Sequence, residues 1–95
     1  MQGNFKYIGL SFKNTPVAIR ELIALDEDLV KGLIRSLNEL LDLSDVLVLS
    51  TCNRTEVYYS AEKDLSVEII KVLGIKKGLP NMIDYKDYFH VINDA

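Results

Sequence analysis

The sequence contains one cysteine, one histidine, two prolines and no tryptophan in 95 residues. A single cysteine cannot form an internal disulfide, and one cysteine with one histidine cannot supply the ligands of a Cys/His zinc site. The chain has no apolar run long enough to cross a bilayer and no basic-then-apolar signal segment at its start. We therefore expect a cytoplasmic protein that does not contact a membrane.

Glycine is also scarce, and the glycine positions exclude one kind of cofactor site. The five glycines are Gly3, Gly9, Gly32, Gly74 and Gly78. None of them forms a G-x-G-x-x-G turn after a strand, which is the motif that holds a dinucleotide pyrophosphate. We expect no Rossmann-type cofactor site in this chain.

Positive charge is in the minority, with 11 Lys and Arg against 14 Asp and Glu, for a net charge of −3. This balance argues against a domain that binds nucleic acid broadly through its phosphates, so any RNA contact should depend on a few basic side chains. The overall composition is that of an average globular protein, with 48% hydrophobic and 26% charged residues. It predicts one small folded domain over residues 1–95.

The spacing of apolar residues predicts the order of secondary structure. Strands are predicted over residues 5–12, 45–50, 55–60 and 82–85. Helices are predicted over residues 16–25, 29–41 and 65–73, with another beginning at residue 86. This order predicts an α+β fold of the ferredoxin-like split βαβ type (β-α-β-β-α-β), in which helices cover one face of an antiparallel sheet.

Four local signals refine this prediction. Thr15 is expected to cap the first helix, with Pro16 at its first position, and Gly74 is expected to end the helix that starts near residue 65. The short apolar run Val46–Leu49, which is rich in β-branched residues, is typical of a strand that is buried on both faces. Of the neighbouring residues Tyr58 and Tyr59, at least one must face the core, so we expect packing rather than base stacking.

Cys52 lies in the most distinctive segment, between two predicted strands, and is expected at the tip of a hairpin. A lone cysteine is most often a small buried residue. Here the polar flanks favour an exposed thiol, and Arg54, two positions later, would favour the thiolate. From the residues alone, a reactive thiol and a structural one both remain open.

Two motifs resemble those of the glutamyl-tRNA reductases. Residues 50–58, Ser-Thr-Cys-Asn-Arg-Thr-Glu-Val-Tyr, resemble the signature of that family without interruption. The opening of the chain is similar to the family's N-terminal motif through Gly9-Leu10-Ser11, Lys13, Pro16-Val17 and Ile19-Arg20-Glu21. Phe12 departs from that motif, because the family often has histidine there. The resemblance is to the N-terminal catalytic domain and is densest over residues 8–58.

The resemblance implies an NADPH-dependent oxidoreductase that converts the glutamate carried by glutamyl-tRNA to glutamate-1-semialdehyde, for tetrapyrrole (haem) biosynthesis. It implies that Cys52 is the catalytic nucleophile and forms a thioester with the glutamyl group. It also implies that Thr51, Asn53 and Arg54 line the substrate pocket. Arg54 would hold the substrate's side-chain carboxylate, which a planar guanidinium matches in two hydrogen bonds.

The family also has a histidine at the start of a helix, and the resemblance offers two residues for that position. His90 fits without a gap and is the favoured catalytic residue, because an imidazole titrates near neutral pH. In another register Asp87 occupies the position. Lys13 and Arg20 are candidates for contact with the tRNA acceptor end, although solvated surface charge explains them equally well.

The resemblance further implies domains that this chain lacks. In the family an NADPH-binding domain and a helical dimerisation domain follow, so the full-length protein is expected to be a homodimer, and the catalytic domain itself continues beyond Ala95. We expect this fragment to be unable to complete the reduction. Two rival interpretations are a non-catalytic ferredoxin-like binding module with a structural Cys52, and an unrelated thiol hydrolase that uses Cys52 with His90.

Overall fold

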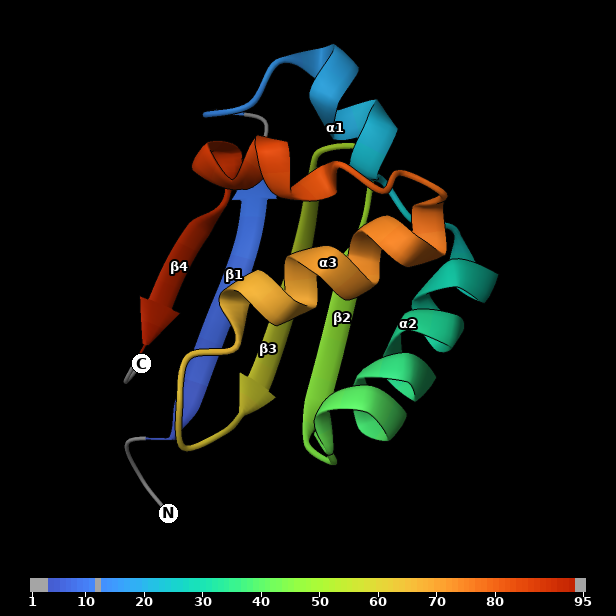
Figure 1. The fold of residues 1–95 in the computed structure, drawn as a ribbon. Helices are drawn as coiled ribbons and strands as arrows, with labels where there is room; N and C mark the ends of the chain where they lie inside the picture. The colour runs from blue at the N-terminus through green and yellow to red at the C-terminus, as the bar shows by residue number, and fades with distance from the viewer. Residues whose placement is uncertain (1–3, 12, 94–95) are drawn as a thin grey trace.

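A computed structural model describes residues 4–11 and 13–93 of the chain (Figure 1). The departure noted at Phe12 lies outside the described residues. The elements in chain order are β1 (Phe5–Ser11), α1 (Val17–Ile23), α2 (Glu27–Leu41), β2 (Val46–Ser50), β3 (Arg54–Ser60), α3 (Ser66–Lys77), the 3-10 helix η1 (Met82–Tyr88) and β4 (His90–Asn93). None of the described helices is long and apolar enough to span a bilayer.

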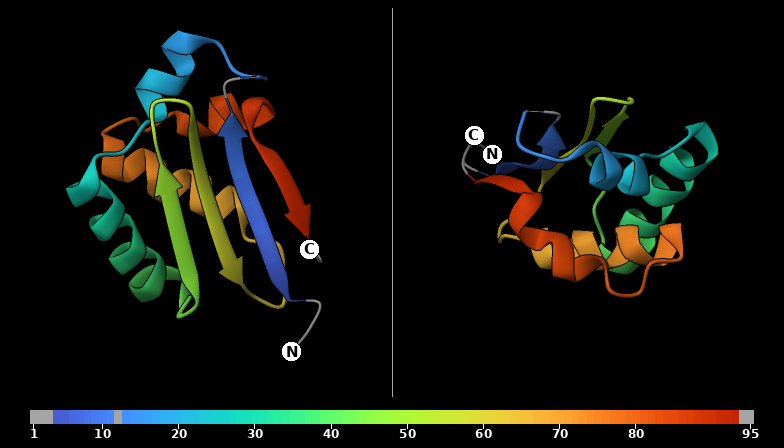
Figure 2. Two further views of the ribbon diagram at one scale, coloured as in Figure 1. Left: turned by 180° about the vertical axis from the view of Figure 1, so that it is seen from behind. Right: turned by 90° about the horizontal axis from the view of Figure 1, so that it is seen from above.

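The four strands form one sheet in the order β2-β3-β1-β4, and all three neighbouring pairs are antiparallel. Helices α2 and α3 pack on one face, while α1 lies beyond the end of the sheet where the β2–β3 turn is found (Figures 1 and 2). The opposite face, here called the open face, carries no helix among the described residues (Figure 2). The α+β ferredoxin-like prediction is confirmed.

Alternation along the strands sends one set of side chains to the helices and the other to the open face. On β1 and β3, the cross-strand pair Ile8 and Val57 is buried towards the helices, as is Tyr59. Tyr58 instead faces the open side, so the expectation that one of the two tyrosines packs in the core is confirmed. The core is completed by apolar side chains of the two long helices: Leu33, Leu37, Ile69, Ile70 and Leu73.

The prediction that the Val46–Leu49 strand is buried on both faces is wrong. β2 is an edge strand that pairs only with β3. Val48 faces the core, but Leu47 and Leu49 are 54% and 43% exposed. The reason is the layer arrangement: because α2 and α3 cover only one face, a strand at the edge can bury only alternate residues.

Two predicted helix ends also differ from the structure. Pro16, and not Thr15, precedes the first helix, and it makes no side-chain cap. The Thr15 hydroxyl is buried and has no hydrogen-bond partner among the described residues. The helix predicted to end at Gly74 continues to Lys77, and Gly78 ends it in the left-handed conformation with φ of +69°. Gly74 serves packing instead.

The last two predicted elements are wrong in type. Residues 82–88 form η1 and not a strand, and residues 90–93 form β4 and not a helix. Met82 is buried and anchors η1 against α3. β4 then pairs with the free edge of β1, where the backbone N–H and C=O groups of β1 need hydrogen-bond partners. This pairing is a long-range contact that local spacing does not indicate.

Candidate functional site

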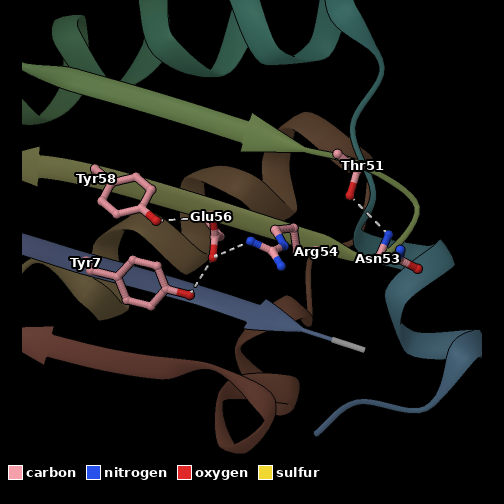
Figure 3. Close-up of polar contacts among 6 residues, drawn as sticks. All are labelled: Tyr7, Thr51, Asn53, Arg54, Glu56 and Tyr58. Atoms are coloured by element: carbon pink, nitrogen blue, oxygen red, sulfur yellow. Dashed lines mark hydrogen bonds and ion pairs between the residues drawn. The ribbon is translucent and has the colours of Figure 1, made fainter. Parts of the chain in front are cut away.

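Cys52 lies at the tip of the β2–β3 hairpin and is exposed, as the sequence predicted. The Thr51 N–H donates to the Arg54 carbonyl oxygen at 2.8 Å and closes the turn. Within the turn, the Asn53 N–H donates to the Thr51 hydroxyl oxygen at 3.1 Å (Figure 3). Thr51 and Asn53 therefore hold the backbone on both sides of the thiol.

The base of the hairpin is tied to the helical layer through Ser50. Its hydroxyl oxygen accepts from the Leu25 N–H at 3.0 Å and lies 3.1 Å from the hydroxyl oxygen of Thr55. Leu25 belongs to the segment between α1 and α2. The loop that carries Cys52 thus starts from anchored backbone, which is what a reactive group needs in order to be presented in one geometry.

Arg20 of α1 contacts the same loop from outside the sheet. Its Nη1 lies 3.4 Å from the Cys52 carbonyl oxygen and 3.4 Å from the Asn53 side-chain oxygen. Its Nε donates to the Thr15 carbonyl oxygen at 3.2 Å. From the sequence, Arg20 was expected to contact RNA or to be a solvated surface charge, and its contact with the Cys52 loop was not predicted. The one sequence feature that could have indicated this contact is the position of Arg20 in the N-terminal motif.

Arg54 begins β3 and extends over the open face (Figure 3). Its side chain is 51% exposed, and its Nη1 lies 4.0 Å from Oε2 of Glu56, whose side chain is only 10% exposed. Glu56 accepts hydrogen bonds from the hydroxyls of Tyr7 at 3.1 Å and Tyr58 at 3.2 Å. Burial, and then the hydrogen bond to Glu56 and its charge, raise the pKa of Tyr7 to about 12, so its hydroxyl stays protonated near neutral pH.

His90 is not brought next to Cys52. It opens β4 and pairs with Gly9 of β1, and its ring lies 6.4 Å from that of Tyr7. β1 separates β4 from β3, so at about 4.8 Å per strand His90 is roughly 10 Å from the β3 backbone, and the hairpin tip is farther along the sheet. The alternative residue, Asp87, is exposed in η1. Neither residue lies at the start of an α-helix.

The described residues contain no group of three or more His, Cys, Asp or Glu side chains positioned to hold a metal ion. Gly9 is inside a strand, Gly74 packs against Met82, and Gly78 ends a helix, so these glycines do not form a G-x-G-x-x-G turn. The site therefore defines an α+β domain with an exposed cysteine on a hydrogen-bonded loop, beside two arginines.

Comparison with known proteins identifies the family. The family model described as "Glutamyl-tRNAGlu reductase, N-terminal domain" matches residues 8–95, and the chain belongs to this family. It is 43% identical over 94 residues to a glutamyl-tRNA reductase of Cytophaga hutchinsonii, covering 99% of this chain and 22% of that protein. It is 36% identical over 85 residues to one from Desulfitobacterium hafniense, covering 88% of this chain and 19% of that protein.

A solved structure agrees with the fold. Glutamyl-tRNA reductase from Methanopyrus kandleri superimposes with a TM-score of 0.67 at 25% identity, covering 97% of this chain and 19% of that one. The chain thus spans about a fifth of the length of these relatives.

Proposed function

We propose that this chain is the part of a glutamyl-tRNA reductase that receives the glutamyl group and forms a thioester with it through Cys52. The observation that carries the proposal is the exposed thiol at the tip of an anchored hairpin, inside the segment that the family model matches. A structural cysteine would be expected in the core, where a small apolar side chain packs well.

The proposed reaction is an acyl transfer. The Cys52 thiolate attacks the ester carbonyl carbon, a carbon–sulfur bond forms, and the bond from that carbon to the ribose oxygen breaks. The tRNA leaves with its ribose oxygen, which takes up a proton. Reduction of the thioester to glutamate-1-semialdehyde needs a hydride, and we assign it to NADPH held by a part of the full-length protein outside this chain.

We assign the substrate's side-chain carboxylate to Arg54. Half of its side chain is exposed beside the hairpin, and a guanidinium has five N–H donors, so contact with Glu56 leaves donors for a second carboxylate. Thr51 and Asn53 would shape the pocket, since their side-chain oxygens already accept hydrogen bonds that hold the loop. Glutamyl-tRNA is the proposed partner that binds at this site.

We also propose that His90 takes part in catalysis, although the sheet register gives it no direct contact with the hairpin tip. The full-length protein is proposed to be a homodimer, formed through a domain outside this chain, and to act in the cytoplasm.

Thioester trapping tests the proposed function. Full-length protein is mixed with tRNA carrying labelled glutamate, in the absence of NADPH, and quenched in acid. We expect about one label per active site, released by neutral hydroxylamine, and none in Cys52→Ala. Glu39→Gln, an exposed change on α2, should label like the wild type. Absence of label in the wild type, or label that survives Cys52→Ala, would overturn the proposal.

A further inference from the structure

Glu56 is an acidic side chain that is almost buried on a face of the sheet that no described helix covers. On that face Leu49 lies directly opposite on β2, and the rings of Tyr7 and Tyr58 form the next residue pair along the sheet. A carboxylate is unfavourable in such a place unless hydrogen bonds compensate for the water it loses. The compensation here consists of two tyrosine hydroxyls and one guanidinium.

The two tyrosines are themselves fixed. Tyr7 and Tyr58 are direct cross-strand partners, with ring centroids 5.1 Å apart in an edge-to-face arrangement. The hydroxyl of Tyr7 also occupies the space above Gly9, since a Cβ added there would lie 2.6 Å from it. The rings therefore cannot turn freely, and their hydroxyls direct both oxygens of Glu56. The carboxylate is held in one orientation before any substrate arrives.

We infer that Glu56 is a positioning residue for Arg54, which it keeps over the open face so that the substrate's side-chain carboxylate is received on that face. This inference rests on the proposed function. Arg54 and Glu56 are two residues apart on β3 and so point to the same side. An arginine side chain has many rotamers. The oriented carboxylate of Glu56 favours the rotamer of Arg54 in which the free edge of the guanidinium is available to the substrate carboxylate.

Steady-state kinetics of the full-length enzyme test the inference. Glu56→Gln retains the shape of the side chain but loses its charge. We expect it to raise KM for glutamyl-tRNA about tenfold, with little change in kcat, because one charge-assisted interaction no longer orders the binding group. In an Arg54→Ala background the same substitution should have no further effect, because the residue it acts through is gone. Glu39→Gln is the matched loss of an acidic charge and should behave like the wild type.

A second measurement separates positioning from a purely structural role. Selectivity for glutamyl-tRNA over tRNA charged with glutamine depends on the substrate carboxylate, so Glu56→Gln should reduce that ratio about tenfold. A general loss of folded enzyme would lower both activities equally. If Glu56→Gln does not fold, Tyr58→Phe removes one of the two hydroxyls that hold the carboxylate, and a smaller loss of selectivity is expected.

The outcomes distinguish the two proposals. A wild type that forms no thioester overturns the proposed function and this inference together. A wild type that forms the thioester overturns the inference alone if Glu56→Gln leaves selectivity unchanged. The inference also fails if Glu56→Gln and Arg54→Ala raise KM by independent, multiplying factors.

Discussion

Arg20 on α1 lies with its Nη1 3.4 Å from the carbonyl oxygen of Cys52, a residue 32 positions later in the chain. The contact joins the two segments that carry the family resemblance, 9–21 and 50–58, at one place beside the candidate nucleophile. Segment 9–21 therefore contributes to the site as well as to the fold, because its Arg20 helps to fix the loop that carries the Cys52 thiol.

Replacing Arg20 should affect catalysis more than stability. Its hydrogen bonds to the loop are exposed, so we expect Arg20→Ala to lower the free energy of unfolding by no more than about 1 kcal/mol. The rate of thioester formation should fall about tenfold, since loss of positioning at a reacting group is costly. Arg20→Lys should not restore it, because a single ammonium cannot contact the loop and the Thr15 carbonyl oxygen together, as Nη1 and Nε of the guanidinium do.

Single-turnover rates and urea unfolding of each variant measure these two effects. Arg35→Ala, an exposed arginine on α2, is the control and should retain the wild-type rate. A wild-type rate in Arg20→Ala would show that the loop is positioned without this contact.

Cys52 should react in the folded protein. It is exposed at the hairpin tip, so iodoacetamide should label it without denaturant. The matched control is Cys52→Ser combined with Val48→Cys, which moves the only thiol of this chain to a buried position on β2. That thiol should be labelled only after unfolding. Mass spectrometry of the peptide that contains the thiol reads both results, and protection of Cys52 in the native state would favour the binding-module interpretation.

The two glycines at positions 9 and 32 should respond to alanine in opposite directions. A Cβ at Gly9 would lie 2.6 Å from the Tyr7 hydroxyl and 2.9 Å from the Thr55 carbonyl oxygen. We expect Gly9→Ala to destabilise the fold by about 1–3 kcal/mol, as overpacking does. Gly32→Ala meets nothing closer than 3.7 Å and lies inside α2, so it should stabilise by about 0.5–1 kcal/mol. Denaturant midpoints measure both.

Asp64 should make stability depend on pH in the acid range. The hydroxyl of Ser66 first, and then the backbone of Ser66, the side chain of Asn93 and the charge of Lys6, hold the pKa of Asp64 below its usual value. Because the folded-state pKa lies below the unfolded value of about 3.9, the stabilisation is complete above that pH and is lost as pH falls through the folded-state pKa.

Asp64→Asn is the matched variant, because it retains an oxygen acceptor at the start of α3 but does not titrate. Its free energy of unfolding should approach that of the wild type as pH is lowered from 6 to about 2. A constant difference across that range would show that the ionised carboxylate contributes nothing specific.

His90 is tested by its substitution with glutamine. If it transfers a proton during turnover, His90→Gln should change the shape of the pH–rate profile. Labelling of Cys52 should be unchanged, because β1 lies between β4 and β3. An unchanged profile would remove His90 from the proposed catalytic residues.

Local sequence patterns determined much of the secondary structure of this protein. Two examples are the three- and four-residue spacing of leucines in α2 and the polar residues 51–53 between two strand-forming segments, which are properties of neighbouring residues. They were enough to predict α2, the hairpin and the exposure of Cys52, because helix and strand periodicity and turn chemistry depend on nearby positions. The fold class was also predicted, but its fourth strand lies at residues 90–93 and not at residues 82–85.

Tertiary structure alone decided which strands lie at the edges and which side chains meet. The one-sided burial of β2, the pairing of β4 with β1 and the hydrogen bond from Tyr7 to Glu56, 49 residues apart, are set by the packing of the whole sheet. The same holds for Arg20 beside Cys52. Such contacts join distant residues through hydrogen-bonding groups and burial that only the assembled layers create, and no local pattern encodes them.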